Sequence, residues 1–246
     1  MYVGATVFRG TTGHGTSRSA RCLGRAVEIR EVREARSLMP VIDEMDLTEV
    51  DALTGAAIRE AAVGGIDATR LRLEDVTIVG SRFVGTRLAD ALWEGVVMSG
   101  SVFDGVDLSS ARVDGGKLDR VHFRGCQLSG LSLSGVACEN VIFGDCRLDY
   151  ATFDTVRTAG ALGFVNCSMS ETSLVGCRWD KAVIDGCRLS GLELDHCDLR
   201  GSDLRGNSLA TVRGVGSLRG VTLTADQLAD LTAALVADLE IRIARP

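Results

Sequence analysis

The chain has 246 residues, a formal net charge of −6, 46% hydrophobic residues and only 4% aromatic residues. An acidic net charge argues against direct binding of nucleic acid or of an anionic membrane surface. No apolar run approaches the ~20 residues that a membrane-spanning helix needs, and the first residues lack a signal-peptide pattern. We therefore expect a cytoplasmic protein whose eight cysteines stay reduced.

Residues 1–45 differ in composition from the rest of the chain. Residues 1–38 contain seven arginines and three glutamates, a net charge of +4, so the remaining body carries −10. The same segment is rich in Gly, Ser and Thr, which is typical of loops. The sequence predicts an N-terminal extension over 1–45 that is partly irregular and forms a cap.

The body of the chain repeats every five residues. Stepping by five from Leu73 meets an apolar residue at each step as far as Phe153, and after one inserted residue the series resumes at Phe164 and runs to Leu209. The residue two positions before a central residue is nearly always small or β-branched, and glycine is common two positions after it. A helix needs an apolar spacing near 3.6 residues and a simple strand a period of two. A period of five instead predicts a corner every five residues, with two side chains of each unit inside.

A longer period shows how many units make one coil. Phenylalanine stands at the central position of every fourth unit, as Phe83, Phe103, Phe123, Phe143 and, after the inserted residue, Phe164. Four units therefore complete a coil, and the sequence predicts a four-sided parallel β-solenoid over residues 46–223. With ~4.8 Å between coils, the seven coils of residues 71–210 span ~34 Å. A weaker register continues back through residues 47–63, where a short amphipathic helix is the alternative.

The cysteines follow the same period. Six of them stand two residues before a central residue, in the slot that Ala, Ser, Thr or Val fills elsewhere: Cys126, Cys146, Cys167, Cys177, Cys187 and Cys197. A buried free cysteine behaves as a small apolar side chain, and zinc sites normally use close CxxC pairs or histidines. We interpret the cysteines as packing residues and expect free thiols, with no metal site.

The C-terminal region, 224–246, breaks the period. Thr224 and Gln227 have the spacing of a capping box. Four leucines follow on one face of a predicted helix: Leu228, Leu231, Leu235 and Leu239. Ile241 and Ile243 then alternate like a short strand. We expect this α-helical cap to close the last coil, because an open solenoid end exposes unpaired backbone groups.

The sequence shows no arrangement that is typical of catalysis. Its three histidines, His14, His122 and His196, lie in no recognisable nucleophile context, and in the solenoid the last two point outward. The glycines are accounted for by corners and not by a phosphate-binding loop. We expect neither enzymatic activity nor a cofactor.

One predicted wall is strongly acidic. The wall centred on Leu73, Trp93, Val113, Leu133, Phe153, Leu174 and Leu194 has only two bases, Arg72 and Arg112. Seven carboxylates face outward from it, giving a net charge of −5: Glu74, Asp75, Glu94, Asp114, Asp154, Glu193 and Asp195. A line of carboxylates on a rod is suited to a basic groove on a protein partner.

The units "SRFVG", "VDLSS", "CRLDY", "CDLRG" and "SDLRG" resemble the pentapeptide-repeat family. The resemblance implies an all-β, right-handed quadrilateral parallel β-helix. It is nearest to the members that mimic DNA and bind DNA gyrase, although this chain lacks their long loops. It implies a binding protein that engages a type II topoisomerase and protects against its inhibitors, with a homodimer formed through the C-terminal helix. The alternative is a structural or scaffolding solenoid with another protein partner.

Overall fold

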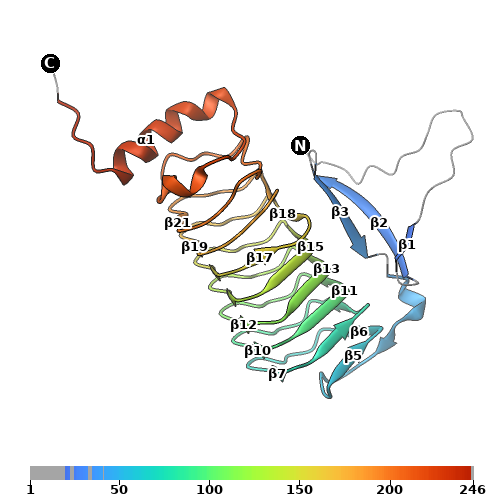
Figure 1. Cartoon of the computed structure of the whole chain (residues 1–246). Helices are drawn as coiled ribbons and strands as arrows, with labels where there is room; N and C mark the ends of the chain where they lie inside the picture. Colours follow the sequence, from blue (N-terminus) through green and yellow to red (C-terminus); the bar gives the residue numbers. More distant parts are fainter. Residues whose placement is uncertain (1–19, 23–24, 33–34, 41, 245–246) are drawn as a thin grey trace, which may run out of the picture.

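The computed structural model describes residues 20–22, 25–32, 35–40 and 42–244. Figure 1 shows a stack of coils with a helix at one end and a separate small sheet alongside. The predicted parallel β-solenoid with a C-terminal helix is confirmed. No helix among the described residues has the length and apolarity needed to cross a bilayer.

The solenoid strands form two parallel sheets. The first has seven short strands: β7 (Arg72–Glu74), β10 (Leu92–Glu94), β12 (Arg112–Asp114), β14 (Ser132–Ser134), β16 (Thr152–Asp154), β19 (Ser173–Val175) and β21 (Glu193–Asp195). The second has eleven: β4 (Thr48–Glu49), β5 (Ala57–Arg59), β6 (Ala61–Gly64), β8 (Thr77–Val79), β9 (Arg82–Val84), β11 (Val97–Asp104), β13 (Lys117–Arg124), β15 (Ala137–Gly144), β17 (Arg157–Thr158), β18 (Leu162–Val165) and β20 (Val183–Asp185).

The register of these sheets stacks each coil directly on the preceding one. Trp93 pairs with Val113 and Val113 with Leu133, so residues four units apart lie side by side. We call the seven-stranded sheet the acidic wall. We call the wall formed by β6, β9, β18, β20 and the second halves of β11, β13 and β15 the phenylalanine wall. Its five phenylalanine rings stack inside the coil with centroids 4.5 to 4.9 Å apart.

The small residue of each unit joins one coil to the next. Ser81 Oγ accepts a hydrogen bond from the Ala61 N–H at 3.2 Å and donates to the Val79 carbonyl at 3.1 Å. Cys187 does the same, since its Sγ accepts from the Cys167 N–H at 3.3 Å. All seven cysteines with described side chains are free, and all but the half-buried Cys197 are buried. The interpretation of the period-five cysteines as packing residues is therefore confirmed.

The inserted residue lies at a corner between β17 and β18. Val141 pairs with Leu162, so this coil is one residue longer than the coils before it. Thr158 stands at a central position but does not fill the core. Its Oγ1 accepts from the Asp180 N–H at 2.9 Å. The larger Trp179 of the next coil fills the space, with its ring 5.3 Å from that of Phe164. The insertion is thus absorbed without shifting the walls.

The N-terminal region is more regular than the sequence predicts. Residues 47–63 form strands β4, β5 and β6 of the first coil, so the alternative of a helix there is wrong. Before them stand three antiparallel strands, β1 (Ala20–Cys22), β2 (Arg25–Val32) and β3 (Ala35–Pro40), and the short 3-10 helix η1 (Glu44–Asp46). Strand β3 lies against β11, β13 and β15. Strand β3 therefore lies along the side of the solenoid, whereas the sequence predicts a cap.

The C-terminal region contains η2 (Val215–Leu218), η3 (Ala225–Gln227) and α1 (Leu228–Asp238). The predicted capping box is confirmed, with the Thr224 N–H donating to Gln227 Oε1 at 2.8 Å. The short strand expected at Ile241 and Ile243 is wrong. Glu240 takes a left-handed φ of 51°, and residues 241–244 pair with no strand of the described chain.

Polar side chains of the C-terminal region close the last coil. They bond to backbone groups that a further coil would otherwise satisfy. Gln227 Nε2 donates to the carbonyls of Leu204 at 2.9 Å and Asn207 at 2.7 Å. The Asp230 carboxylate accepts from the Leu209 N–H at 3.1 Å. The Asp238 carboxylate accepts from the N–H groups of Gly214 at 2.8 Å and Val215 at 3.0 Å. The end of the solenoid is thereby covered, as an edge of unpaired strands requires.

Candidate functional site

The predicted acidic residues lie together on the acidic wall. Six of them belong to its strands, and Asp75 is at the corner after β7. Residues that follow the central position stack in register, so the outward column reads Glu74, Glu94, Asp114, Ser134, Asp154, Val175 and Asp195. Neighbours in such a column are separated by the strand spacing of ~4.8 Å. Ser134 and Val175 interrupt the column, so it is continuous only over its first three carboxylates.

Those three carboxylates, Glu74, Glu94 and Asp114, are exposed and have no ion pair or side-chain hydrogen bond with any described residue. Acids on the other walls are different, because most have a base nearby. Asp67 and Arg87, one coil apart, approach to 2.9 Å, and Glu139 and Lys117 to 2.7 Å. We call Glu74, Glu94 and Asp114 the carboxylate column.

The acids toward the C-terminal end of the wall are less free. Glu193 pairs with Arg213 at 3.1 Å, and Arg213 also reaches Glu171 at 3.3 Å. Asp195 contacts His196 Nδ1 at 2.5 Å. Arg213 was absent from the predicted wall because it lies beyond residue 210. Arg213 stands four units after Glu193, and this spacing predicts that it lies beside Glu193 in the next coil. The backbones of the two residues do form a parallel bridge.

The two described histidines have different surroundings. The side chain of His196 is 90% exposed. His122 is only 8% exposed although it faces away from the coil interior, because it lies on β13, one of the strands against which β3 packs. The prediction that both point outward is correct for direction, but it misses the burial of His122. Among the described residues, no group of three His, Cys, Asp or Glu side chains is arranged to hold a metal ion.

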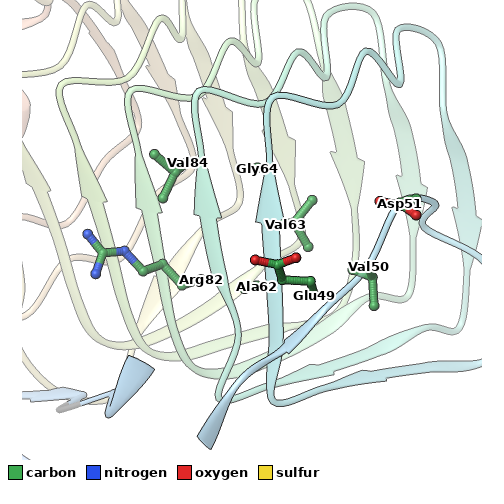
Figure 2. Close-up of a pocket in the computed structure, with 8 residues that line it drawn as sticks. All are labelled: Glu49, Val50, Asp51, Ala62, Val63, Gly64, Arg82 and Val84. Atoms are coloured by element: carbon green, nitrogen blue, oxygen red, sulfur yellow. The ribbon is translucent and has the colours of Figure 1, made fainter. Parts of the chain in front are cut away.

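Two hollows lie on the solenoid surface. The first, of about 280 Å³, is at the N-terminal end of the phenylalanine wall. Figure 2 shows that the guanidinium of Arg82 points away from the carboxylate of Glu49 there. The second, of about 660 Å³, lies at the inserted corner, where Arg205 is paired with Asp203 at 2.6 Å.

The helix leucines divide between two faces. Leu231 packs against the solenoid core, whereas Leu228, Leu235 and Leu239 are 57%, 38% and 60% exposed. Ala234, and not a leucine, is the buried residue of α1. The predicted cap therefore rests on Leu231 together with the polar contacts described above. The other three leucines form an apolar surface at the end of the rod.

Stacked thiols shift each other's pKa, and a hydrogen bond from Cys167 lowers the pKa of Cys187. Cys177 and Cys197 occupy the same slot in consecutive coils, and a hydrogen bond from the Cys177 thiol lowers the pKa of Cys197 to about 7. The same contact and burial raise the pKa of Cys177. Cys197 is the more exposed partner of this pair.

Comparisons with known proteins agree with the repeat. The family of pentapeptide repeats matches in eight copies, over residues 81–120 and 164–206. No curated protein matches the sequence. Among solved structures, a trypsin-treated form of QnrB1, a plasmid-mediated fluoroquinolone resistance protein, is 20% identical, covers 77% of this chain and 99% of its own, and has a TM-score of 0.41. HetL, a pentapeptide repeat protein involved in heterocyst differentiation regulation from the cyanobacterium Nostoc sp. strain PCC 7120, is 18% identical, covers 68% and 83%, and has a TM-score of 0.28.

Proposed function

Because this chain is a pentapeptide-repeat protein, we propose that it is a non-enzymatic DNA mimic that binds DNA gyrase or a related type II topoisomerase. The acidic wall occupies the basic groove in which the enzyme holds DNA. Binding there modulates the enzyme and protects it against inhibitors that act on its complex with DNA.

The observation that supports this proposal is the unpaired state of the carboxylate column. Three like charges one coil apart repel one another. Because none of the three carboxylates forms an ion pair with a described residue, this repulsion lowers stability in the free protein, and a basic partner would relieve it. Since most acids of the other walls are paired, solubility alone does not account for the difference between the walls.

The density of negative charge on the acidic wall determines how strongly its binding should depend on salt. Duplex DNA carries one charge per ~1.7 Å of axis, or ~20 charges over ~34 Å. The acidic wall carries seven carboxylates and two arginines over seven coils. We expect binding that weakens with salt, with a shallower dependence than that of DNA itself.

A homodimer would double the length of the acidic surface. We propose that the exposed Leu228, Leu235 and Leu239 of one copy pack against those of a second copy, which joins two rods end to end. Sedimentation analysis of the wild type and of a Leu235→Glu/Leu239→Glu variant tests this. The wild type should sediment as a dimer and the variant as a folded monomer, and a monomeric wild type at micromolar concentration would contradict the proposal.

The interruption of the acidic column by Ser134 and Val175 favours a second candidate. In that case the solenoid is a scaffold that binds another protein through a flat wall, with no requirement for continuous charge.

A gyrase supercoiling assay with and without a fluoroquinolone distinguishes the two. The test variant is Glu74→Lys/Glu94→Lys/Asp114→Lys. The matched control reverses three acids of other walls, as Asp67→Lys/Asp104→Lys/Glu139→Lys. A DNA mimic inhibits supercoiling or rescues the drug-poisoned enzyme, loses this effect in the test variant and largely keeps it in the control. A folded wild type without effect, or equal loss in both variants, would leave the scaffold as the better candidate.

A further inference from the structure

Cys177 and Cys197 form a stacked pair of thiols near the C-terminal end of the solenoid. They stand in the same slot of consecutive coils, and the Asp198 N–H donates to the Cys177 carbonyl at 2.8 Å. The Cys177 sulfur lies 3.2 Å from the carbonyl oxygen of Phe153. The Cys197 sulfur lies 3.2 Å from that of Leu174, which pairs with Phe153 one coil further on. The two thiols therefore occupy equivalent places, one coil apart.

The spacing of this pair is compatible with a disulfide. Paired strands lie ~4.8 Å apart, and the Cα atoms of cysteines joined by a disulfide are usually about 4.4–6.8 Å apart. The Cys177 thiol already donates a hydrogen bond to Cys197, and this bond favours the thiolate of Cys197. Rotation of the two side chains can therefore bring the sulfurs within bonding distance while the coils stay paired.

Access to solvent distinguishes this pair from the other stacked cysteines. Cys197 is half-buried, whereas every other cysteine whose side chain the structure describes is buried. Cys167 and Cys187 are also stacked, since Cys187 Sγ accepts from the Cys167 N–H at 3.3 Å. They are only 2% and 7% exposed. A small reagent in solution can therefore reach the Cys177–Cys197 pair through Cys197, and the Cys167–Cys187 pair is shielded from it.

We propose that Cys197 is a site of oxidation by hydrogen peroxide and that Cys177 is its resolving thiol. The Cys197 thiolate attacks one peroxide oxygen, the O–O bond breaks, and hydroxide leaves as Cys197 becomes a sulfenic acid. The Cys177 sulfur then attacks Cys197 Sγ and the S–O bond breaks. The thiol proton of Cys177 leaves with the departing oxygen as water, and a disulfide joins the two coils. Neither step involves the acidic wall or its partner.

Peptide mass spectrometry of the full chain, treated with hydrogen peroxide at neutral pH, tests this site. The wild type should form a Cys177–Cys197 disulfide that dithiothreitol reverses. Cys177→Ser keeps a hydroxyl donor beside Cys197 and lacks the resolving thiol, so Cys197 should accumulate as a sulfenic acid that dimedone labels. Serine fills the same slot in other units, as Ser81 and Ser202. We therefore expect this variant to keep the circular dichroism of the wild type.

Cys167→Ser is the matched control, because it removes one thiol of the buried stacked pair. It should still form the Cys177–Cys197 disulfide, and dimedone should label Cys187 at least about tenfold less than it labels Cys197 in Cys177→Ser. Equal labelling of Cys187 and Cys197 would contradict a site defined by access. If the folded wild type forms no Cys177–Cys197 disulfide while dimedone labels Cys197, Cys177 is not the resolving thiol. If neither product forms, Cys197 is not a site of oxidation.

Discussion

Gln227 lies 20 residues after Asn207 and donates its Nε2–H to the Asn207 carbonyl at 2.7 Å. One coil earlier, Asn207 Oδ1 accepts from the Cys187 N–H at 2.8 Å, also across 20 residues. A side chain of the cap therefore continues the column of hydrogen bonds that joins the coils. The solenoid ends where Gln227 stands in for the next strand.

Replacing Gln227 by alanine should destabilise the protein. Gln227 is buried and bonds to two backbone carbonyls, and a buried polar group without a partner costs about 1–3 kcal/mol. Urea unfolding should give a lower midpoint. The control Asp226→Ala changes an exposed residue of the same turn and should leave the midpoint nearly unchanged. Equal midpoints for the two variants would show that water replaces Gln227 without cost.

Glu94→Gln should make the protein more stable and should weaken its binding to gyrase. Glu94 stands between Glu74 and Asp114 in the carboxylate column, and removing its charge relieves repulsion worth about 0.5 kcal/mol. The gain should shrink in 1 M salt, where the Debye length is ~3 Å. Glu193→Gln is the contrasting variant. Because Glu193 forms an ion pair with Arg213 at 3.1 Å, removing its charge should not increase the stability of the protein. A stability for Glu94→Gln that is lower than wild type at low salt would contradict the repulsion argument.

Cys197 should react with iodoacetamide at a pH where ordinary thiols are slow. Its pKa is lowered from 9.0 to about 7 by the hydrogen bond from Cys177, and the thiolate is the reactive form. The labelling rate should rise as the pH increases through about 7, with the site identified by peptide mass spectrometry. In Cys177→Ala the hydrogen bond is absent, so the midpoint should move up toward 9.0. If the midpoint does not change in this variant, the low pKa of Cys197 has a cause other than the hydrogen bond from Cys177.

Deleting residues 1–40 should expose an apolar face without unfolding the coils. Ile142 points away from the coil interior yet is only 1% exposed, and it lies on β15, against which β3 packs. The deletion should retain the β-sheet circular dichroism and increase the fluorescence of the dye ANS. Adding Ile142→Ser to the deleted chain should reduce that increase. If the deletion leaves ANS binding unchanged, β3 is not what covers this face.

Most of the fold was predictable from the repeat, because the residue types at each position of a five-residue unit indicate which side chains are buried. The stacked phenylalanines and the cysteine slots follow from the four-unit period alone. Residues 20–40 have no such period, and the place of β3 on the phenylalanine wall depends on tertiary contacts that a linear pattern does not encode. The cap was predicted from its leucines, but its closing contacts come from Gln227, Asp230 and Asp238, whose partners are backbone groups. The carboxylate column was predictable by position. Its lack of partners, and the neutralisation of Glu193 by Arg213, required the structure.

The inserted corner between β17 and β18 also bears on how such a rod changes during evolution. Because the corner absorbs one residue and the pairing resumes at Val141 and Leu162, a small local change in length leaves every later wall in place. Loss of a single unit would instead move each later side chain by a quarter turn, and Asp195 would leave the acidic wall. Gain or loss of a whole coil only lengthens or shortens the rod. Duplication of whole coils can therefore tune the reach of this protein while its faces stay aligned.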